Sequence, residues 1–273
     1  MRILRIFPRK TTATPDDANV IINRMPNLFD VADRINISVS FMWDIPRAEK
    51  LFKAWQVVAP VEIGGPAFNE PGGEFESGLY LKKGYTITSR GCPNKCWFCS
   101  VWKREPVLRE LEIKSGWNIV DDNLLATSDQ HIKNIFKMLR DQKHPAIFSG
   151  GIEAKLLKKW HVDLFASIRL KELFCAYDTP DDYEPLVEAG KLLKQANITY
   201  ENRKARAYVL IGYPGDTMEN ALIRIKQTLN AGFFPFAMLY RNDKGEFKRE
   251  WRQFQRQWAN PIITAVNCKK INN

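Results

Sequence analysis

The chain has 273 residues, of which 45% are hydrophobic and 12% aromatic, a composition that is ordinary for a folded protein and excludes broad disorder. Its apolar runs are short and interrupted by charge, so we expect no membrane span, and its first ten residues are too few and too charged for a secretory signal. The net charge of +10 favours anionic partners or substrates but does not bear on the fold.

The first 78 residues are predicted to form a small α/β unit and a linker. A strand is expected at 36–42, a helix at 47–58 and a second strand at 60–65. A strand, a helix and a strand joined by short links make a βαβ crossover, which predicts a small parallel sheet of truncated Rossmann-like type. The Gly/Pro-rich segment 64–78 follows as a connector.

Strand and helix patterns alternate through residues 79–242. The candidate strands lie at 84–89, 116–120, 145–150, 172–177, 206–212 and 234–239. Helical patterns lie between several of these strands, at 128–142, 181–196 and 216–232. Six parallel strands with outer helices predict an α/β fold in the form of a partial (β/α)6 barrel. Such a fold carries its functional residues at the carboxyl ends of the strands.

Residues 243–273 are predicted to form a basic, aromatic helical extension. Within 245–261, four aromatic side chains recur at helical spacing: Phe247, Trp251, Phe254 and Trp258. Such a stripe is typical of a helix that packs its apolar face on a domain. The flanking Lys and Arg side chains leave contact with nucleic acid or an anionic substrate as an alternative.

A cysteine triplet follows the first strand of the second part. Cys92, Cys96 and Cys99 form a C-x3-C-x2-C motif, and the two other cysteines lie far away in the sequence. Five cysteines in this arrangement do not make a disulfide framework, so we expect a cytoplasmic protein with reduced thiols and a metal site at the triplet. Structural zinc favours C-x2-C pairs and needs a fourth ligand, which the sequence does not offer nearby.

The triplet, preceded by "RGCP" and with Phe98 directly before its last cysteine, resembles the motif of the radical S-adenosylmethionine (SAM) superfamily. The six-fold strand and helix pattern is similar to the partial barrel of that family. The resemblance implies that Cys92, Cys96 and Cys99 hold a [4Fe-4S] cluster whose fourth iron is left for SAM. It also implies cleavage of SAM to a 5′-deoxyadenosyl radical, and an electron donor such as flavodoxin or ferredoxin.

The resemblance further implies two rival sites for the amino group of SAM. Asp121, Asp122 and Asn123 follow the second strand of the barrel, although a turn rich in Asp and Asn would look the same. Gly150 and Gly151 in "FSGGIEA" end the third strand and resemble the family's Gly-Gly-Glu motif. Strand order favours the aspartate site.

The remaining SAM contacts are implied in the same way. Phe98 is expected beside the adenine, and Asp178 after the fourth strand is expected at the ribose hydroxyls, with helix capping as the alternative for Asp178. "LIGYPGDT" is similar to the family's glycine motif beside the adenine, which implicates Gly212 and Gly215.

The N-terminal unit resembles a shortened cobalamin-binding domain. It is too short for the full doubly wound sheet, and no histidine occurs before His131, so the motif that supplies a lower axial ligand is missing. We therefore do not expect cobalamin. The alternative is a vestigial sheet that covers an open strand edge.

The cysteine count also limits the reaction. A second cluster is not expected because only Cys175 and Cys268 remain, the first as a core residue and the second as a surface thiol. Three hypotheses follow. The chain is a radical SAM enzyme acting on a small substrate, a radical SAM modifier of nucleic acid or peptide, methylation included, or a non-catalytic, zinc-stabilised nucleic-acid-binding protein. The sequence does not identify the substrate.

Overall fold

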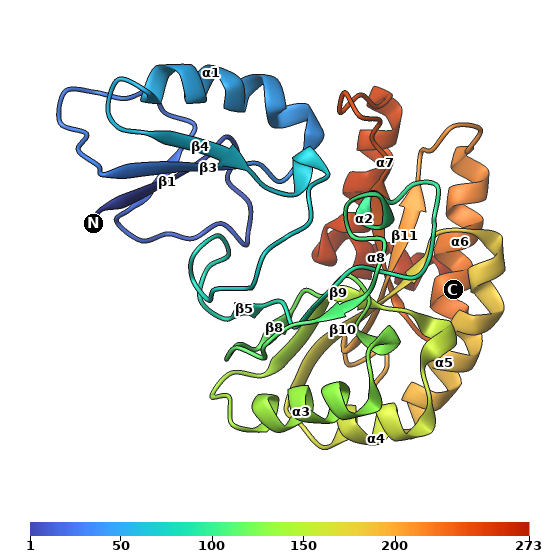
Figure 1. Cartoon of the computed structure of the whole chain (residues 1–273). Helices are drawn as coiled ribbons and strands as arrows, with labels where there is room; N and C mark the ends of the chain where they lie inside the picture. The colour runs from blue at the N-terminus through green and yellow to red at the C-terminus, as the bar shows by residue number, and fades with distance from the viewer. Residues whose placement is uncertain (273) are drawn as a thin grey trace.

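Two parallel sheets organise the chain in the computed structural model, which describes residues 1–272 (Figure 1). The first sheet has four strands in the order β2-β1-β3-β4. Its strands are β1 (Ile3–Phe7), β2 (Val20–Ile22), β3 (Arg34–Ser38) and β4 (Val61–Gly64). The helix α1 (Ile45–Trp55) connects β3 to β4 and covers one face of this sheet (Figure 1).

Alternation of apolar and polar residues fixes which face of the small sheet is buried. Leu4 and Ile6 of β1 and Ile35 of β3 pack with Leu51 and Trp55 of α1, and all five are almost fully buried. The sequence prediction located β3, α1 and β4 but missed β1 and β2. β2 has only three residues and no helix joins it to β1, so neither strand carries the pattern of a βαβ unit.

The second sheet has six strands, and their spatial order follows the chain. They are β5 (Tyr85–Thr86), β8 (Asn118–Ile119), β9 (Ala146–Ile152), β10 (Leu170–Tyr177), β11 (Ala205–Ile211) and β12 (Phe234–Leu239). Every neighbouring pair is parallel. The structure therefore has the α/β class that the sequence predicts.

Four helices lie along the outer side of this sheet (Figure 1). They are α3 (Asp129–Arg140), α4 (Lys159–Ala166), α5 (Tyr183–Gln195) and α6 (Met218–Asn230). Parallel strands in sequential order, joined by right-handed crossovers, place their helices on one face. α6 is capped at its start by the Thr217 side chain, which accepts a hydrogen bond from the Asn220 amide, and Gly232 follows its end with φ +90°.

The structure corrects the predicted elements in several places. The strand expected at 84–89 is divided into β5 and β6 (Ser89–Arg90), and β6 pairs in antiparallel fashion with β7 (Arg109–Glu110). The helix α4 was not predicted, because it is short and its apolar side chains are interrupted by charge. A further short helix, α2 (Val101–Arg104), follows the cysteines.

The C-terminal segment forms two helices, α7 (Arg249–Ala259) and α8 (Pro261–Asn272). Trp251 and Trp258 of α7 are buried against residues of β11, β12 and α6, which confirms the packing role of the aromatic stripe. Phe247 lies before the helix, so the predicted start of the helix was too early.

Cys268 was expected at the surface and is instead buried in the same cluster, where burial raises the pKa of its thiol to about 11. Cys175 is a core residue of β10, as predicted. Within residues 1–272, the structure contains no helix with the length and apolarity to cross a membrane.

Candidate functional site

The three clustered cysteines lie on the loop between β6 and α2, beside the carboxyl ends of the six-stranded sheet. All three thiols are half-buried. The Asn94 amide from this loop donates to the Glu153 carboxylate at 2.9 Å, directly after β9. Trp97, also from this loop, contacts the ring of Tyr213, which follows β11, with 5.6 Å between centroids. The loop therefore contacts the sheet edge where a fold of this kind carries functional residues.

Asn123 and Glu153 form a polar pair beside Cys92. The Asn123 amide nitrogen lies 3.4 Å from the Cys92 sulfur and donates to a Glu153 carboxylate oxygen at 2.6 Å. The other Glu153 oxygen forms an ion pair with Lys155 at 2.7 Å. The Asn123 side-chain oxygen is buried and has no hydrogen-bond partner within residues 1–272. A buried acceptor without a partner is costly, and it fits a ligand that brings its own N–H donor.

The surroundings of Cys96 and Cys99 favour their neutral thiols. Burial raises the pKa of Cys96, and the neighbouring Cys99 and Cys92 sulfurs add to this effect. Burial also raises the pKa of Cys99, against which the Val101 amide acts by donating to the sulfur at 3.4 Å. A cation at this loop would reverse this preference, because thiolates are stabilised by bound metal and by N–H donors.

No group of three or more His, Cys, Asp or Glu side chains converges on a common point as ligands of a single ion would, anywhere in the described part of the chain. A tetrahedral zinc site needs four such ligands around one centre at about 2.0–2.3 Å. In an iron–sulfur cluster each thiolate binds a different iron, so its cysteines need not converge in this way. Cys92, Cys96 and Cys99 lie on one half-buried loop, where N–H groups donate to the sulfurs of Cys92 and Cys99.

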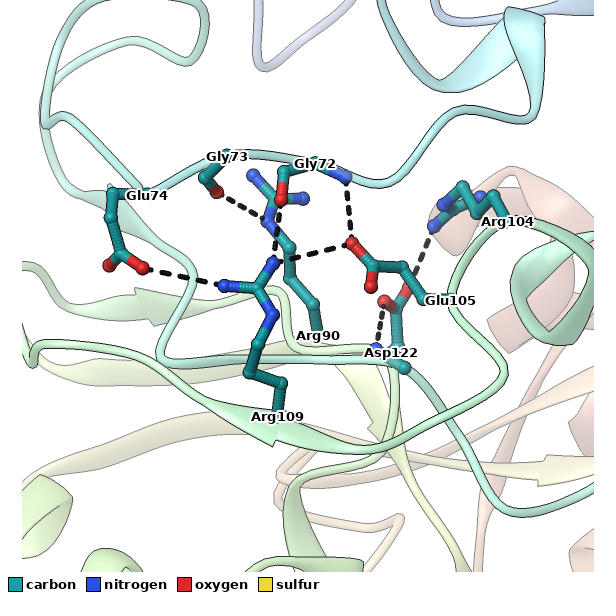
Figure 2. Close-up of polar contacts among 9 residues, drawn as sticks. Gly72, Gly73, Glu74, Arg90, Arg104, Glu105, Arg109 and Asp122 are labelled. Carbon is teal, nitrogen blue, oxygen red and sulfur yellow. Dashed lines mark hydrogen bonds and ion pairs between the residues drawn. The ribbon is translucent and has the colours of Figure 1, made fainter.

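Asp121 and Asp122 are engaged by the chain itself. The buried Asp121 carboxylate accepts hydrogen bonds from the Thr88 amide at 2.6 Å, the Thr88 hydroxyl at 2.5 Å and the Ser89 hydroxyl at 3.0 Å. Asp122 accepts from the Gly91 amide at 2.9 Å and pairs with Arg104 at 2.8 Å (Figure 2). Of the three consecutive residues predicted here, only Asn123 keeps an oxygen without a partner in residues 1–272.

Asp178 lies just after β10 and has no hydrogen bond to its carboxylate from residues 1–272. Burial, with a smaller contribution from the neighbouring Asp182 carboxylate, raises its pKa to about 7. Asp178 is not the helix cap that the sequence offered as an alternative. Its neighbours Thr179 and Asp182 form the capping box of the 3-10 turn that precedes α5. Asp178 therefore has a carboxylate available at the sheet edge, and it is close enough to Cys96 to affect that thiol's pKa.

The glycines predicted from the sequence divide into two kinds. A side chain at Gly150 would meet the Asp121 backbone oxygen at 2.5 Å, so this glycine allows β9 to pass close to the segment after β8. Gly151, by contrast, has φ +100° and open space around its Cβ position. Gly212 and Gly215 also adopt positive φ, and the Gly212 amide donates to Asp216 at 2.8 Å. At Gly151 and Gly215 the space beside the backbone is open, so a ligand can approach the backbone closely there.

Aromatic rings cover the loop. Phe98 is half-buried and packs edge-on against Trp97, with 5.3 Å between ring centroids. Trp97 in turn contacts Tyr213 and Tyr240, which follow β11 and β12 respectively. Trp97 remains 53% exposed, so this aromatic group is partly open to solvent.

Several of these residues were not singled out from the sequence, namely Asn94, Trp97, Glu153 and Tyr213. Glu153 had a usable signal, since it follows the Gly150–Gly151 pair by two residues at the end of a predicted strand. The other three are recognisable only from the contacts that the fold creates.

The chain matches no family model, and no curated protein matches it. The functional assignment therefore depends on the geometry of the site and on the cysteine motif.

Proposed function

We propose that the chain is a radical SAM enzyme, in which Cys92, Cys96 and Cys99 hold a [4Fe-4S] cluster and the six-stranded sheet serves as the partial barrel. The observation that carries the proposal is the position of the cysteine loop at the carboxyl edge of a parallel sheet whose strand order follows the chain. When bound, the cluster supplies the electron that cleaves SAM to a 5′-deoxyadenosyl radical, which abstracts hydrogen from a substrate.

The chain's own residues are assigned to binding and enclosure. Asn123 offers its buried oxygen, and Glu153 a carboxylate, to the amino group of SAM. Asp178 offers its carboxylate to the ribose hydroxyls. Phe98 and the open backbone at Gly215 are assigned to the adenine. The rings of Trp97, Tyr213 and Tyr240 are assigned to excluding water from the reacting groups.

The experiment is anaerobic reconstitution of the full chain with iron, sulfide and reductant, followed by addition of SAM and measurement of 5′-deoxyadenosine. We expect about four irons per chain and formation of 5′-deoxyadenosine. Replacing Cys92, Cys96 or Cys99 with alanine should abolish both, whereas Cys268→Ala is a matched control that removes a thiol buried elsewhere. Full activity in any one of the three loop variants would refute the ligand assignment.

The basic face of α7 supports a nucleic-acid substrate as the second candidate. Trp251 and Trp258 are buried, whereas Arg252 and Arg256 are exposed on the same helix. Phosphate contacts give an affinity that falls steeply with salt. The measurement is RNA and DNA binding over a salt series, for the wild type and for the double variant Arg252→Ala/Arg256→Ala. If the affinity does not depend on these arginines, the nucleic-acid candidate is excluded and a small substrate is favoured.

The N-terminal unit is given no cofactor in this proposal. That it does not hold cobalamin stays a prediction from the sequence.

A further inference from the structure

A cavity of about 480 Å³ lies between the small sheet and the segments around the cysteine loop. This volume is within the range of small-molecule sites, roughly 300–1,000 Å³. The walls come from β3, β4, the linker after β4, and the β6 and α2 segments. Six lining residues define its chemical character: Asn36, Ser38, Gly64, Phe75, Arg90 and Arg104.

The first wall is the face of the small sheet that α1 leaves uncovered. Asn36 pairs in register with Glu62, and Ser38 with Gly64, so these four residues share one face. They alternate with Ile35 and Ile37, whose side chains pack on the α1 side. Parallel sheets are normally covered on both faces by apolar contacts. Here the second face is polar and small, and it borders the cavity, where the Asn36 oxygen has no hydrogen-bond partner in residues 1–272.

The second wall is the linker, and buried side chains fix it at both ends. Arg5 of β1 donates to the carbonyl oxygens of Gly78 at 2.9 Å and Leu79 at 2.5 Å. At the other end, Arg109 donates to the Gly72 carbonyl oxygen at 2.6 Å (Figure 2). The buried Glu105 carboxylate accepts from the Gly72 amide at 2.7 Å. The linker is therefore an ordered wall of the cavity.

Arg90 supplies a positive charge to the cavity and forms no ion pair within the described chain, although the carboxylates of Asp122 and Glu105 lie near enough to act on its pKa. Its guanidinium donates one hydrogen bond, from Nε to the Gly73 carbonyl oxygen at 3.1 Å, and lies against the Gly72 backbone (Figure 2). Within residues 1–272 no carboxylate lies within ion-pairing distance of Arg90. By contrast, Arg104 on the same cavity is paired with Asp122. Two terminal nitrogens of Arg90 are thus free to bind an anion, in the bidentate manner typical of arginine.

The acidic residues of the lining do not neutralise this charge. Glu62 pairs with Arg34 and Glu74 with Arg109, and both glutamate side chains are mostly exposed. Glu70 and Glu76 are exposed as well. Charges in contact with water are screened by salt far more than a half-buried guanidinium is.

We propose that this cavity binds a small organic anion, whose carboxylate or phosphate group pairs with Arg90 and whose apolar part lies against Phe75. The apolar lining also includes Leu79 and Ile87. Arg104 lies five residues after Cys99, so the cavity borders the segment that follows the cysteine loop. That the anion is the substrate of the radical reaction rests on the proposed function, whereas its binding does not.

The test uses the full-length protein and the amphipathic anion 8-anilinonaphthalene-1-sulfonate as the probe, followed by its fluorescence. Arg90→Met removes the charge, and Arg140→Met removes an exposed arginine from α3 as the matched control. Gly64→Phe fills the cavity from the sheet face without touching any charge, because a Cβ at Gly64 meets no atom within 4 Å. This second variant keeps the test decisive if Arg90→Met does not fold.

We expect Arg90→Met to weaken probe binding about tenfold or more, as loss of a charge-assisted contact does. Gly64→Phe should abolish binding, and Arg140→Met should not change it. Hexanoate or phenyl phosphate should displace the probe, and the one effective at lower concentration identifies the anion as carboxylate or phosphate. The neutral hexanamide should not displace it.

Equal probe affinity in the wild type, Arg90→Met and Gly64→Phe would overturn the proposal, as would displacement by hexanamide. Loss of binding on Leu28→Ser would do the same, because Leu28 is a 98% exposed apolar residue that does not line the cavity. Cys92→Ala should bind the probe like the wild type. A failure of SAM cleavage and a failure of anion binding are therefore read separately.

Discussion

Asp121 offers the sharpest distinction between a structural carboxylate and one that binds SAM. Its two oxygens accept three hydrogen bonds from Thr88 and Ser89, and all three residues are buried. The replacement Asp121→Asn keeps the shape and exchanges one acceptor oxygen for an amide donor. That amide must face either the Thr88 amide or the pair of hydroxyls, so at least one donor is left without an acceptor inside the protein.

The expected loss of stability follows from these contacts. Hydrogen bonds to charged groups contribute about 1.5–3 kcal/mol each, and a buried donor left unpaired costs a similar amount. Burial raises the pKa of Asp121, so the ionised carboxylate carries a desolvation cost that offsets part of this gain. We therefore expect the free energy of unfolding to fall by about 3 kcal/mol, which corresponds to a Tm lower by about 6–12 °C.

The assay is thermal and urea unfolding of the wild type, Asp121→Asn and Thr88→Val. Thr88→Val removes only the hydroxyl and should cost about 1 kcal/mol. Calorimetric titration with SAM, on the reconstituted protein, completes the comparison. If Asp121→Asn kept the wild-type Tm and lost SAM affinity instead, the carboxylate would be a ligand of SAM and our structural interpretation would be wrong.

Three other predictions concern the linker, a buried histidine and the junction between the two sheets. Gly72→Ala should displace the Arg90 guanidinium, because a Cβ there would lie 2.5 Å from it, and should therefore weaken binding of the anionic probe. Gly73→Ala, whose Cβ would meet no atom within 4 Å, should bind the probe like the wild type. His161 is buried with a pKa lowered to about 4, mainly by burial, so the unfolded state binds more protons below its ordinary pKa of 6.5. Stability should therefore fall by about 2 kcal/mol between pH 7 and pH 5, and His161→Phe should remove this dependence in urea unfolding. Arg241 lies over the ring of Trp43 at 5.3 Å, and Arg241→Ala should lower the free energy of unfolding by about 1 kcal/mol, measured against Trp43→Ala and the double variant.

The strands and helices that the sequence predicted well are those with long periodic patterns. β10, β11 and β12 were found almost to the residue, because each is a largely buried apolar run of six to eight residues bounded by turn residues. β5 and β8 have only two residues each, so a pattern of six or five residues overstated them. β5 and β8 pair only over two residues each, with Thr86 beside Ile119, so no long apolar run marks them in the sequence.

The candidate site was less predictable than the fold. The cysteine triplet is visible from spacing alone, but the partners of Asp121 come from Thr88 and Ser89, more than thirty residues earlier in the chain. A turn rich in Asp and Asn does not show which of its side chains face inward. The sequence alone therefore could not distinguish Asp121, which is engaged by the chain, from Asn123, which has an oxygen to offer.

The linker and the cysteine loop are connected through a single short stretch of chain. α2 begins two residues after Cys99 and ends at Arg104, which pairs with Asp122 at the carboxyl end of β8. The next residue, Glu105, holds the Gly72 amide (Figure 2). A displacement of α2 would thus change the Arg104–Asp122 contact and the linker wall of the cavity together. Asp122 also adjoins Asn123, whose side chain lies beside Cys92. The same few hydrogen bonds therefore order both the cysteine loop and the cavity wall. Through these bonds, a ligand in the cavity would stabilise the loop.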